Sequence, residues 1–186
     1  MYDTTDIRKG LTFEQDGVPF VVLEFQFVKP GKGTAFTRTK IRNMMSGAVL
    51  DKTFKSGEKL TPANTEDREM QYLYYDVEYH FMDNSNYEQE SLESDIVGDL
   101  SNYLTESMIV SVVFFQGKAI GLTIPNFVVL EVKETTPGEK GNTVTGASKP
   151  AFLSTGYSVN VPLFVNEGDI IRIDTRTGEY VERVKN

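Results

Sequence analysis

Apolar side chains recur at every second position from 21 to 27, the spacing of a β-strand with one face turned to a core. That face holds Val21, Leu23, Phe25 and Phe27. From 35 to 42 the alternation resumes, with small or apolar side chains at one parity and Phe36 and three cations at the other. The cations are Arg38, Lys40 and Arg42. The pattern predicts two paired strands, with positive charge along one face of the second.

The residues between these strands predict a tight turn. Pro30 fixes φ at the first corner, and Gly31 can take the positive φ that a type II turn requires next. Gly33 keeps the tip free of side-chain bulk, so that a partner can approach the backbone closely. Lys32 would then be a long cation held out at the tip of a hairpin. An ordinary solvated hairpin with surface lysines is the alternative that spacing alone leaves open.

Strand-sized segments bounded by Gly, Pro, Asn or Asp dominate the rest of the chain. A long alternating strand is expected over residues 73–81, with Leu73, Tyr75, Val77, Tyr79 and Phe81 on one face. A helix is expected over 94–104, although Gly98 weakens it. The C-terminal stretch IRIDTRTGEYVERV predicts a hairpin that turns at 175–178.

Two breaks in the pattern divide the chain into three predicted domains. The polar, proline-containing segment 61–69 indicates a linker, and a second boundary falls near 125–128. The domains would span residues 1–64, 65–127 and 128–186. Small all-β barrels of about 60 residues each fit this pattern better than one sandwich, because a barrel closes its strand edges.

Charge is distributed unevenly over these three segments, although the whole chain carries a formal −8. Residues 1–64 hold ten Lys and Arg against seven Asp and Glu, a balance of +3. Residues 65–127 hold two against twelve, or −10, and residues 128–186 hold seven against eight, or −1. Screening over a Debye length of about 8 Å separates such regions electrostatically. A basic first domain can therefore meet phosphate while the acidic second domain stays clear of it, or serves only solubility.

The residues offer little for enzyme chemistry. The chain has no cysteine and one histidine, His80, so a thiol nucleophile is excluded and a dedicated transition-metal site is not expected. The phosphate-binding pattern GxxxxGK[ST] is absent. An acidic run at 88–99 lacks the spacing of a calcium loop and indicates a solvated face. Paired carboxylates for hydrolysis stay open, because their separations are unknown from sequence.

The sequence indicates a cytoplasmic protein. The absence of cysteine excludes a disulfide framework, and no apolar run is long enough to span a bilayer. The first ten residues carry early acid and no apolar core, unlike a secretory signal.

A second motif lies in the last third of the chain and has the form K-x-A-x4-G-x2-V-x-V-P-x2-V-x2-G. It is formed by Lys149, Ala151, Gly156, Val159, Val161, Pro162, Val165 and Gly168. Together with VKPGKG, the strand TKIRN and the closing hairpin, it closely resembles bacterial translation elongation factor P. The resemblance covers essentially the whole chain, in the same three-domain order, and the two motifs lie about 120 residues apart.

This resemblance implies a fold and a function. The fold would be an N-terminal SH3-like (KOW-type) barrel followed by two OB-fold domains, in an elongated, L-shaped, tRNA-like arrangement. The factor would bind both ribosomal subunits beside peptidyl-tRNA and promote peptide bond formation at consecutive prolines. It would position the CCA end through Lys32, lengthened by a modifying enzyme. Lys29, Pro30, Gly31 and Gly33 would support that lysine.

The resemblance also implies further contacts. Arg38, Lys40 and Arg42 are candidates for RNA phosphates. Gly141, Asn142 and Thr143 match a loop that faces the small subunit and the mRNA, where the family commonly has Gly-Asp-Thr. No catalytic residue, cofactor or metal is implied, and a cytoplasmic monomer is expected. A lysine tip is compatible with β-lysylation or an aminopentanol-type extension, and it disfavours the arginine-rhamnose variant.

Two rival classes remain at this point. One is an enzyme that uses carboxylates on a β scaffold. The other is a modification-independent RNA-binding or scaffold protein in which Lys32 is dispensable. The intact mass of native protein separates both rival classes from the translation factor, since a mass increment at Lys32 supports only the translation factor.

Overall fold

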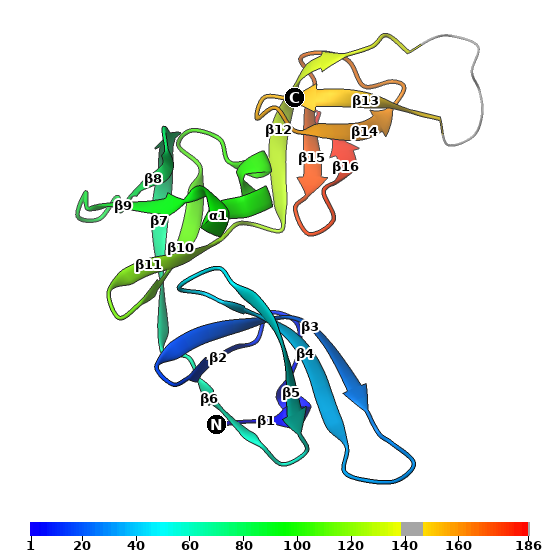
Figure 1. The fold of residues 1–186 in the computed structure, drawn as a ribbon. Coiled ribbons are helices and arrows are strands. Elements are labelled where there is room, and N and C mark those ends of the chain that lie inside the picture. Colours follow the sequence, from blue (N-terminus) through cyan, green and yellow to red (C-terminus); the bar gives the residue numbers. More distant parts are fainter. Residues whose placement is uncertain (139–146, 186) are drawn as a thin grey trace.

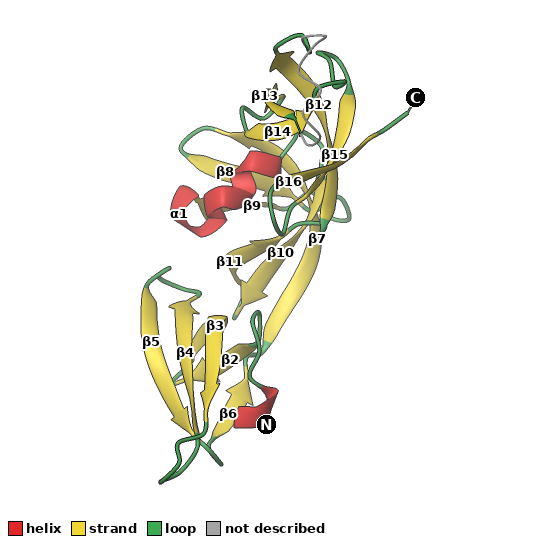
Figure 2. Cartoon of the chain, turned by 90° about the vertical axis from the view of Figure 1, so that its right-hand side faces the viewer, coloured by secondary structure: helices red, strands yellow, loops and turns green. Residues whose placement is uncertain are grey.

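The chain folds into three antiparallel sheets that follow one another along an elongated, bent molecule (Figure 1). The structure is a computed structural model that describes residues 1–138 and 147–185. The two termini lie toward opposite ends in both views (Figure 2). Each sheet curls around a core of its own, which confirms the predicted all-β fold of small barrels. The division into domains at 1–64, 65–127 and 128–186 stays a prediction.

The first sheet has six strands in the order β1-β6-β2-β3-β4-β5. They are β1 (Tyr2–Asp3), β2 (Thr12–Gln15), β3 (Val18–Val28), β4 (Phe36–Asn43), β5 (Val49–Lys55) and β6 (Lys59–Pro62), with a 3-10 turn η1 (Thr4–Asp6). Its core is built around Phe13, which stacks on Phe20 at 5.6 Å and meets the edge of Phe54 at the same distance.

The prediction that alternate residues 21–27 form one core-facing row is wrong, because β3 contains a β-bulge. The pairing with β4 shifts between Val22 and Glu24, so the parity of the core face changes there. Val22 points into the core and is 1% exposed. Phe25 and Phe27 lie beyond Val21, the last β3 residue that pairs with β2, and they are exposed.

The second sheet has five strands in the order β11-β10-β7-β8-β9. They are β7 (Thr65–Tyr75), β8 (Glu78–Met82), β9 (Gln89–Glu93), β10 (Ile109–Phe115) and β11 (Lys118–Thr123). The long strand predicted over 73–81 is wrong, since the chain reverses between β7 and β8. The carboxylate of Asp76 accepts hydrogen bonds from the backbone N–H groups of Val77 and Glu78, which stabilises this reversal.

Two further expectations for this region are corrected. The segment 61–69 contains the connection between the first two sheets only at residues 63–64, because Pro62 ends β6 and Thr65 begins β7, which pairs with β10 along Thr65 to Gln71. Its polar composition reflects the exposed face of a strand. The helix expected over 94–104 is one α-turn, α1 (Ser94–Val97), followed by the 3-10 helix η2 (Gly98–Tyr103). Gly98 interrupts the α-helix with a φ of 53°.

The third sheet has the strand order β14-β13-β12-β15-β16. Its strands are β12 (Phe127–Thr135), β13 (Ser148–Leu153), β14 (Ser158–Pro162), β15 (Ile170–Asp174) and β16 (Glu179–Arg183). The hairpin predicted to turn at 175–178 is confirmed by the pairing of β15 with β16. Lys149, from the C-terminal motif, is buried, and its ammonium donates a hydrogen bond to the carbonyl of Thr136.

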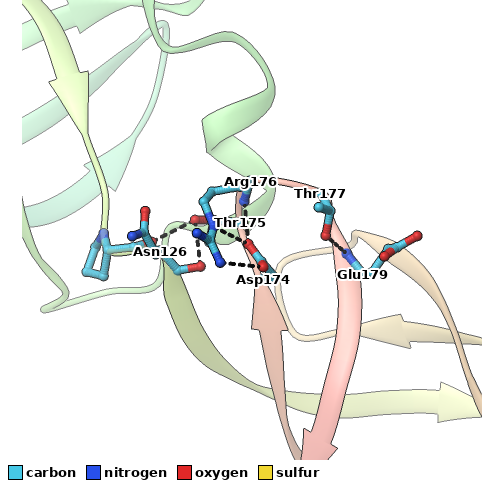
Figure 3. Close-up of polar contacts among 7 residues, drawn as sticks. Asn126, Asp174, Thr175, Arg176, Thr177 and Glu179 are labelled. Atoms are coloured by element: carbon cyan, nitrogen blue, oxygen red, sulfur yellow. Dashed lines mark hydrogen bonds and ion pairs between the residues drawn. The ribbon is translucent and has the colours of Figure 1, made fainter. Parts of the chain in front are cut away.

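The second and third sheets share buried side chains. Tyr103, at the end of η2, packs in the core of the third sheet and meets the ring edge of Tyr157 at 5.5 Å. Met108 and Ile124 pack against both cores. The hydroxyl of Thr155, from the third sheet, donates to the carbonyl of Asn102 in η2 at 2.6 Å. At the connection, the hydroxyl of Thr175 donates to the carbonyl of Pro125 at 2.7 Å, and its N–H donates to that of Asn126 at 2.8 Å, next to the β12–β15 pairing (Figure 3). Apolar burial and hydrogen bonds together tie these two sheets.

The first and second sheets meet differently. Among the described residues, the core cluster of the first sheet contains no side chain from the second. A cleft lies between them, lined by Arg42 and Met44 from the first sheet and by Asp67, Asp95 and Asp99 from the second. Apolar side chains, among them Ile96 and Leu122, line the same cleft, so in the part of the chain that the structure describes this junction mixes charged and apolar contacts without a shared core.

Gly178 tests the tyrosine contact at the junction of the second and third sheets. Its φ is +76°, and a Cβ there would lie 2.5 Å from the Tyr157 hydroxyl, which donates to the Gly178 carbonyl. We expect Gly178→Ala to lower the free energy of unfolding by about 2–3 kcal/mol, from backbone strain and from displacement of the tyrosine. Denaturant unfolding measures this.

Gly168→Ala is the matched control. Gly168 has a φ of +86°, but a Cβ there would meet nothing within 4 Å. Only the backbone cost of about 1 kcal/mol is therefore expected. Equal losses in the two variants would contradict a role for the tyrosine contact.

Candidate nucleic-acid interface

Lys32 lies in a loop that projects from the first sheet. The last residue pair of β3 and β4 is Val28 with Phe36, and residues 29–35 connect them. Figure 1 shows this loop reaching away from the barrel at the lower right. Lys32 is exposed, and within the described residues it makes no hydrogen bond or ion pair. Its ammonium is therefore available to a partner.

The predicted type II turn at Pro30 and Gly31 is wrong. The positive φ of this loop, +104°, belongs to Gly33. Seven residues lie between the last paired positions, so the reversal is spread over a longer loop than a four-residue turn. Pro30 packs toward Gly33, where a Cβ would lie 4.0 Å from the proline ring. Lys29, Gly31 and Gly33 are exposed and Pro30 is half-buried.

The alternation predicted for β4 is confirmed. Thr37, Thr39 and Ile41 are buried, while Arg38, Lys40 and Arg42 are exposed on the opposite face. The Thr39 hydroxyl donates to the carbonyl of Lys52 at 2.7 Å, which satisfies it inside the barrel. Strand geometry thus presents three cations along the outer face of β4.

These three cations have different surroundings. The ammonium of Lys40 lies 3.5 Å from the carboxylate of Glu24 on β3. Arg38 has Gln26 and Thr53 as its cross-strand neighbours, and its guanidinium lies 5.4 Å from the ring centre of Phe36. No ion pair of Arg38 is present among the described residues. Arg38 therefore offers a less compensated charge than Lys40.

Arg42 lies in a different place from the other two cations. Arg38 and Lys40 border a shallow basin on the sheet surface, together with Glu24 and Asp51. Arg42 lines the cleft toward the second sheet, where the opposite wall carries Asp67 and two further aspartates. The structure therefore brings together two of the three predicted RNA contacts. The third faces acid, and its role as an RNA contact stays a prediction.

Gly141, Asn142 and Thr143 lie outside the described residues, so their predicted role stays a prediction as well.

Two side chains that the sequence pattern placed in the core are exposed on the hairpin. Phe25 and Phe27 lie on the inner face of β3, opposite the face that carries Arg38. They lie two positions apart, as residues of a core-facing row on a strand do. Their exposure becomes clear only from the structure, in which β2 stops pairing with β3 before it reaches them.

His80, the single histidine, has a local structural partner. Its Nε2 lies 2.8 Å from Oδ1 of Asp76, and its ring stacks on Tyr74 at 4.6 Å. Hydrogen bonds from the backbone N–H of Glu78, from His80 and from the N–H of Val77 lower the pKa of Asp76 to about 2. Among residues 1–138 and 147–185, no group of three His, Asp or Glu side chains is arranged to hold a metal ion. In the same part of the chain, none of the helices has the length and apolarity needed to cross a membrane.

Three family models match the chain in sequence order. An "Elongation factor P (EF-P) KOW-like domain" matches residues 3–60, an "Elongation factor P (EF-P) OB domain" matches 65–122, and "Elongation factor P, C-terminal" matches 128–183. These matches cover most of all three sheets.

Full-length relatives and one solved structure are also similar. Elongation factor P of Pelotomaculum thermopropionicum is 56% identical over 185 residues, covering 99% of this chain and 100% of that protein. Elongation factor P of Thermoanaerobacter sp. is 57% identical over 180 residues, covering 96% of this chain and 97% of that protein. The structure of eukaryotic translation initiation factor 5A from Methanococcus jannaschii covers 66% of this chain and 92% of its own, at 20% identity and a TM-score of 0.49.

The hydrogen bonds of Asp76 predict its titration. Because its folded-state pKa is depressed, ionised Asp76 stabilises the fold above about pH 4, and this contribution is lost as the pH falls through about 2. In His80→Ala one of three donors is missing, so we expect the pKa of Asp76 to rise toward 3.8 without reaching it. Carboxyl ¹³C NMR titration measures both values. An Asp76 titration unchanged in His80→Ala would show that the ring makes no hydrogen bond to the carboxylate.

Proposed function

The chain belongs to the elongation factor P family, and from that premise we propose that it acts on the ribosome beside peptidyl-tRNA, where Lys32 promotes peptide bond formation between prolines. Family membership makes it a translation elongation factor. The observation that carries the finer proposal is the unpaired, exposed Lys32 on a loop beyond the barrel, described above. A cation placed there can reach into a site that the rest of the protein does not enter.

The proposed action is positioning of another machine's reactants. Proline reacts poorly, because its ring locks φ and its amine is a hindered secondary amine. A stalled peptidyl-tRNA therefore gains from orientation more than from a new acid or base. A near-attack geometry contributes up to about 7–11 kcal/mol, and the factor need supply only part of this. No catalytic residue of the factor itself is required.

The loop is open enough for a modifying enzyme to reach Lys32. Gly31 and Gly33 flank it, and a Cβ at Gly31 would meet nothing within 4 Å. An enzyme can therefore enclose the lysine without displacing other side chains. Lengthening the side chain would extend the reach of its charge toward the CCA end. Lys29, Pro30 and the two glycines would hold the loop in place.

The distribution of charge supports binding to RNA through the first sheet. Arg38 is exposed without an ion pair among the described residues, and Lys32 is at the tip, so both can neutralise phosphates. Lys40 is partly compensated by Glu24. The loop containing Gly141, Asn142 and Thr143 would face the small subunit, and the factor would act as a monomer.

Lys32→Ala tests the role of the tip. Because Lys32 makes no hydrogen bond or ion pair within residues 1–138 and 147–185, we expect the variant to unfold like the parent protein yet to lose rescue of polyproline synthesis in a reconstituted translation system. Lys118→Ala, on the second sheet, is the control and should keep full rescue. Peptide mapping of native protein should place a mass increment on Lys32. Undiminished rescue by Lys32→Ala, with no increment, would favour the modification-independent binder instead.

Charge reversal at two adjacent cations tests the RNA-binding face. Arg38→Glu should weaken ribosome binding and reduce the slope of log K against log salt by about 1, since one phosphate contact is lost. Lys40→Glu should have a smaller effect, because Glu24 already lies 3.5 Å from that ammonium. Binding assays over a range of salt concentrations measure both. A loss that is independent of salt would indicate misfolding.

A further inference from the structure

Phe25 and Phe27 lie on a part of β3 where the first sheet does not bury them. Phe25 is 49% exposed and Phe27 is 59% exposed. Their cross-strand partners, Thr39 and Thr37, are only 4% and 2% exposed. Cross-strand partners lie on the same face of a sheet, so each phenylalanine covers a threonine and leaves the rest of its ring open. The two rings form an apolar surface directly before the Lys32 loop.

The sheet itself does not cover this surface. β2 pairs with β3 only as far as Val21, and the backbone of residues 10–11 bonds to Val22, so in the described part of the chain β3 pairs with β4 alone beyond Val22. Exposed apolar patches of this kind mark interaction sites. A partner that covers the two rings must therefore come from outside the sheet.

The charge around the rings selects an anionic partner. Of the five cations in residues 24–42, Arg38, Lys40 and Arg42 lie on the opposite face of the sheet, whereas Lys29 and Lys32 belong to the loop that the rings border. On the inner face, Lys52 lies across from Thr39 in the same row as Phe25, and its ammonium bonds to the uncharged amide of Gln15. Lys32 lies at the tip, between the inner and outer faces. Aromatic faces beside uncompensated cations are the combination that binds single-stranded nucleic acid.

We propose that Phe25 and Phe27 form a stacking platform for unpaired bases at the 3′ end of the RNA whose backbone Lys32 contacts. The proposal rests on the proposed function and adds to it a contact with the bases. Side chains two residues apart on a strand lie about 7 Å from each other, and stacked nucleotides rise about 3.4 Å each. The spacing of the two side chains along β3 is therefore about two stacking steps of a single strand. Base stacking needs no hydrogen bonds to the base edges, so the rings alone can hold an unpaired base.

Substitution of the rings separates stacking from charge. Phe25→Ala and Phe27→Ala should each weaken binding to ribosomes carrying peptidyl-tRNA by about 5- to 100-fold, with the salt slope unchanged. Arg38→Glu, in contrast, changes the slope. Phe27→Leu keeps an apolar side chain without the ring and should also weaken binding. Circular dichroism and thermal unfolding check that each variant folds.

Tryptophan provides a direct signal, because the chain contains none. Phe27→Trp gives a protein with one tryptophan on the platform, and Tyr87→Trp places it on the second sheet's exposed loop as a control. The probes are an RNA hairpin with an unpaired 3′ CCA overhang and the same hairpin with a blunt end. We expect the overhang to quench the fluorescence of Phe27→Trp and not that of Tyr87→Trp, with little quenching by the blunt hairpin.

Three results would overturn the platform. Equal quenching by both hairpins would show contact with the duplex, and absence of quenching would show no contact with bases. Full binding by Phe25→Ala and Phe27→Ala, together with loss of the Lys32 modification, would assign the surface to the modifying enzyme. The proposed function fails separately: if Lys32→Ala keeps full rescue, the tip has no role, whatever the rings bind.

Discussion

The position of Lys32 depends on strand pairing that continues beyond the barrel. β3 and β4 pair from Phe20 with Asn43 to Val28 with Phe36, whereas β2 leaves β3 at Val21. A two-stranded ribbon is marginally stable in water. Here β5 pairs with β4 along its length, from Arg42 to Phe36, so three strands support the extension. The backbone ladder therefore holds the loop away from the core, and the cations and rings along it keep fixed faces.

The two junctions of the molecule suit different tasks. The second and third sheets share Met108 and Ile124, and Tyr103 reaches from one into the core of the other. Such apolar burial resists relative movement. The junction between the first and second sheets is a cleft with Arg42 on one side and aspartates on the other, lined also by apolar side chains, and among the described residues the core of the first sheet includes no side chain of the second. Without a shared core, this junction resists relative movement less than the other one does.

The sequence predicted features that depend on local spacing. The alternation of β4, the closing hairpin at 175–178 and the three-sheet order all follow from side-chain parity and turn residues. Features set by neighbouring strands were missed. The bulge at Val22 changes parity, and the early end of β2 exposes Phe25, although neither leaves a mark in the residues themselves. Likewise the positive φ of the loop belongs to Gly33 and not to Gly31. The length of this loop depends on where strand pairing ends, which the turn residues alone do not reveal.

The exposure of Phe25 and Phe27 lowers the stability of the fold, and a hairpin with a purely structural role would not require it. Full burial of a phenylalanine contributes about 1.5–3 kcal/mol, so rings that are half exposed forgo about 1 kcal/mol each. A polar pair would avoid this loss and would still leave the backbone ladder intact. The acidic second sheet adds a complementary restriction, since its charge of −10 repels RNA from the rest of the surface. Under the proposed function, repulsion by that sheet and attraction at the hairpin together direct RNA to the tip, where the rings give bases an apolar face.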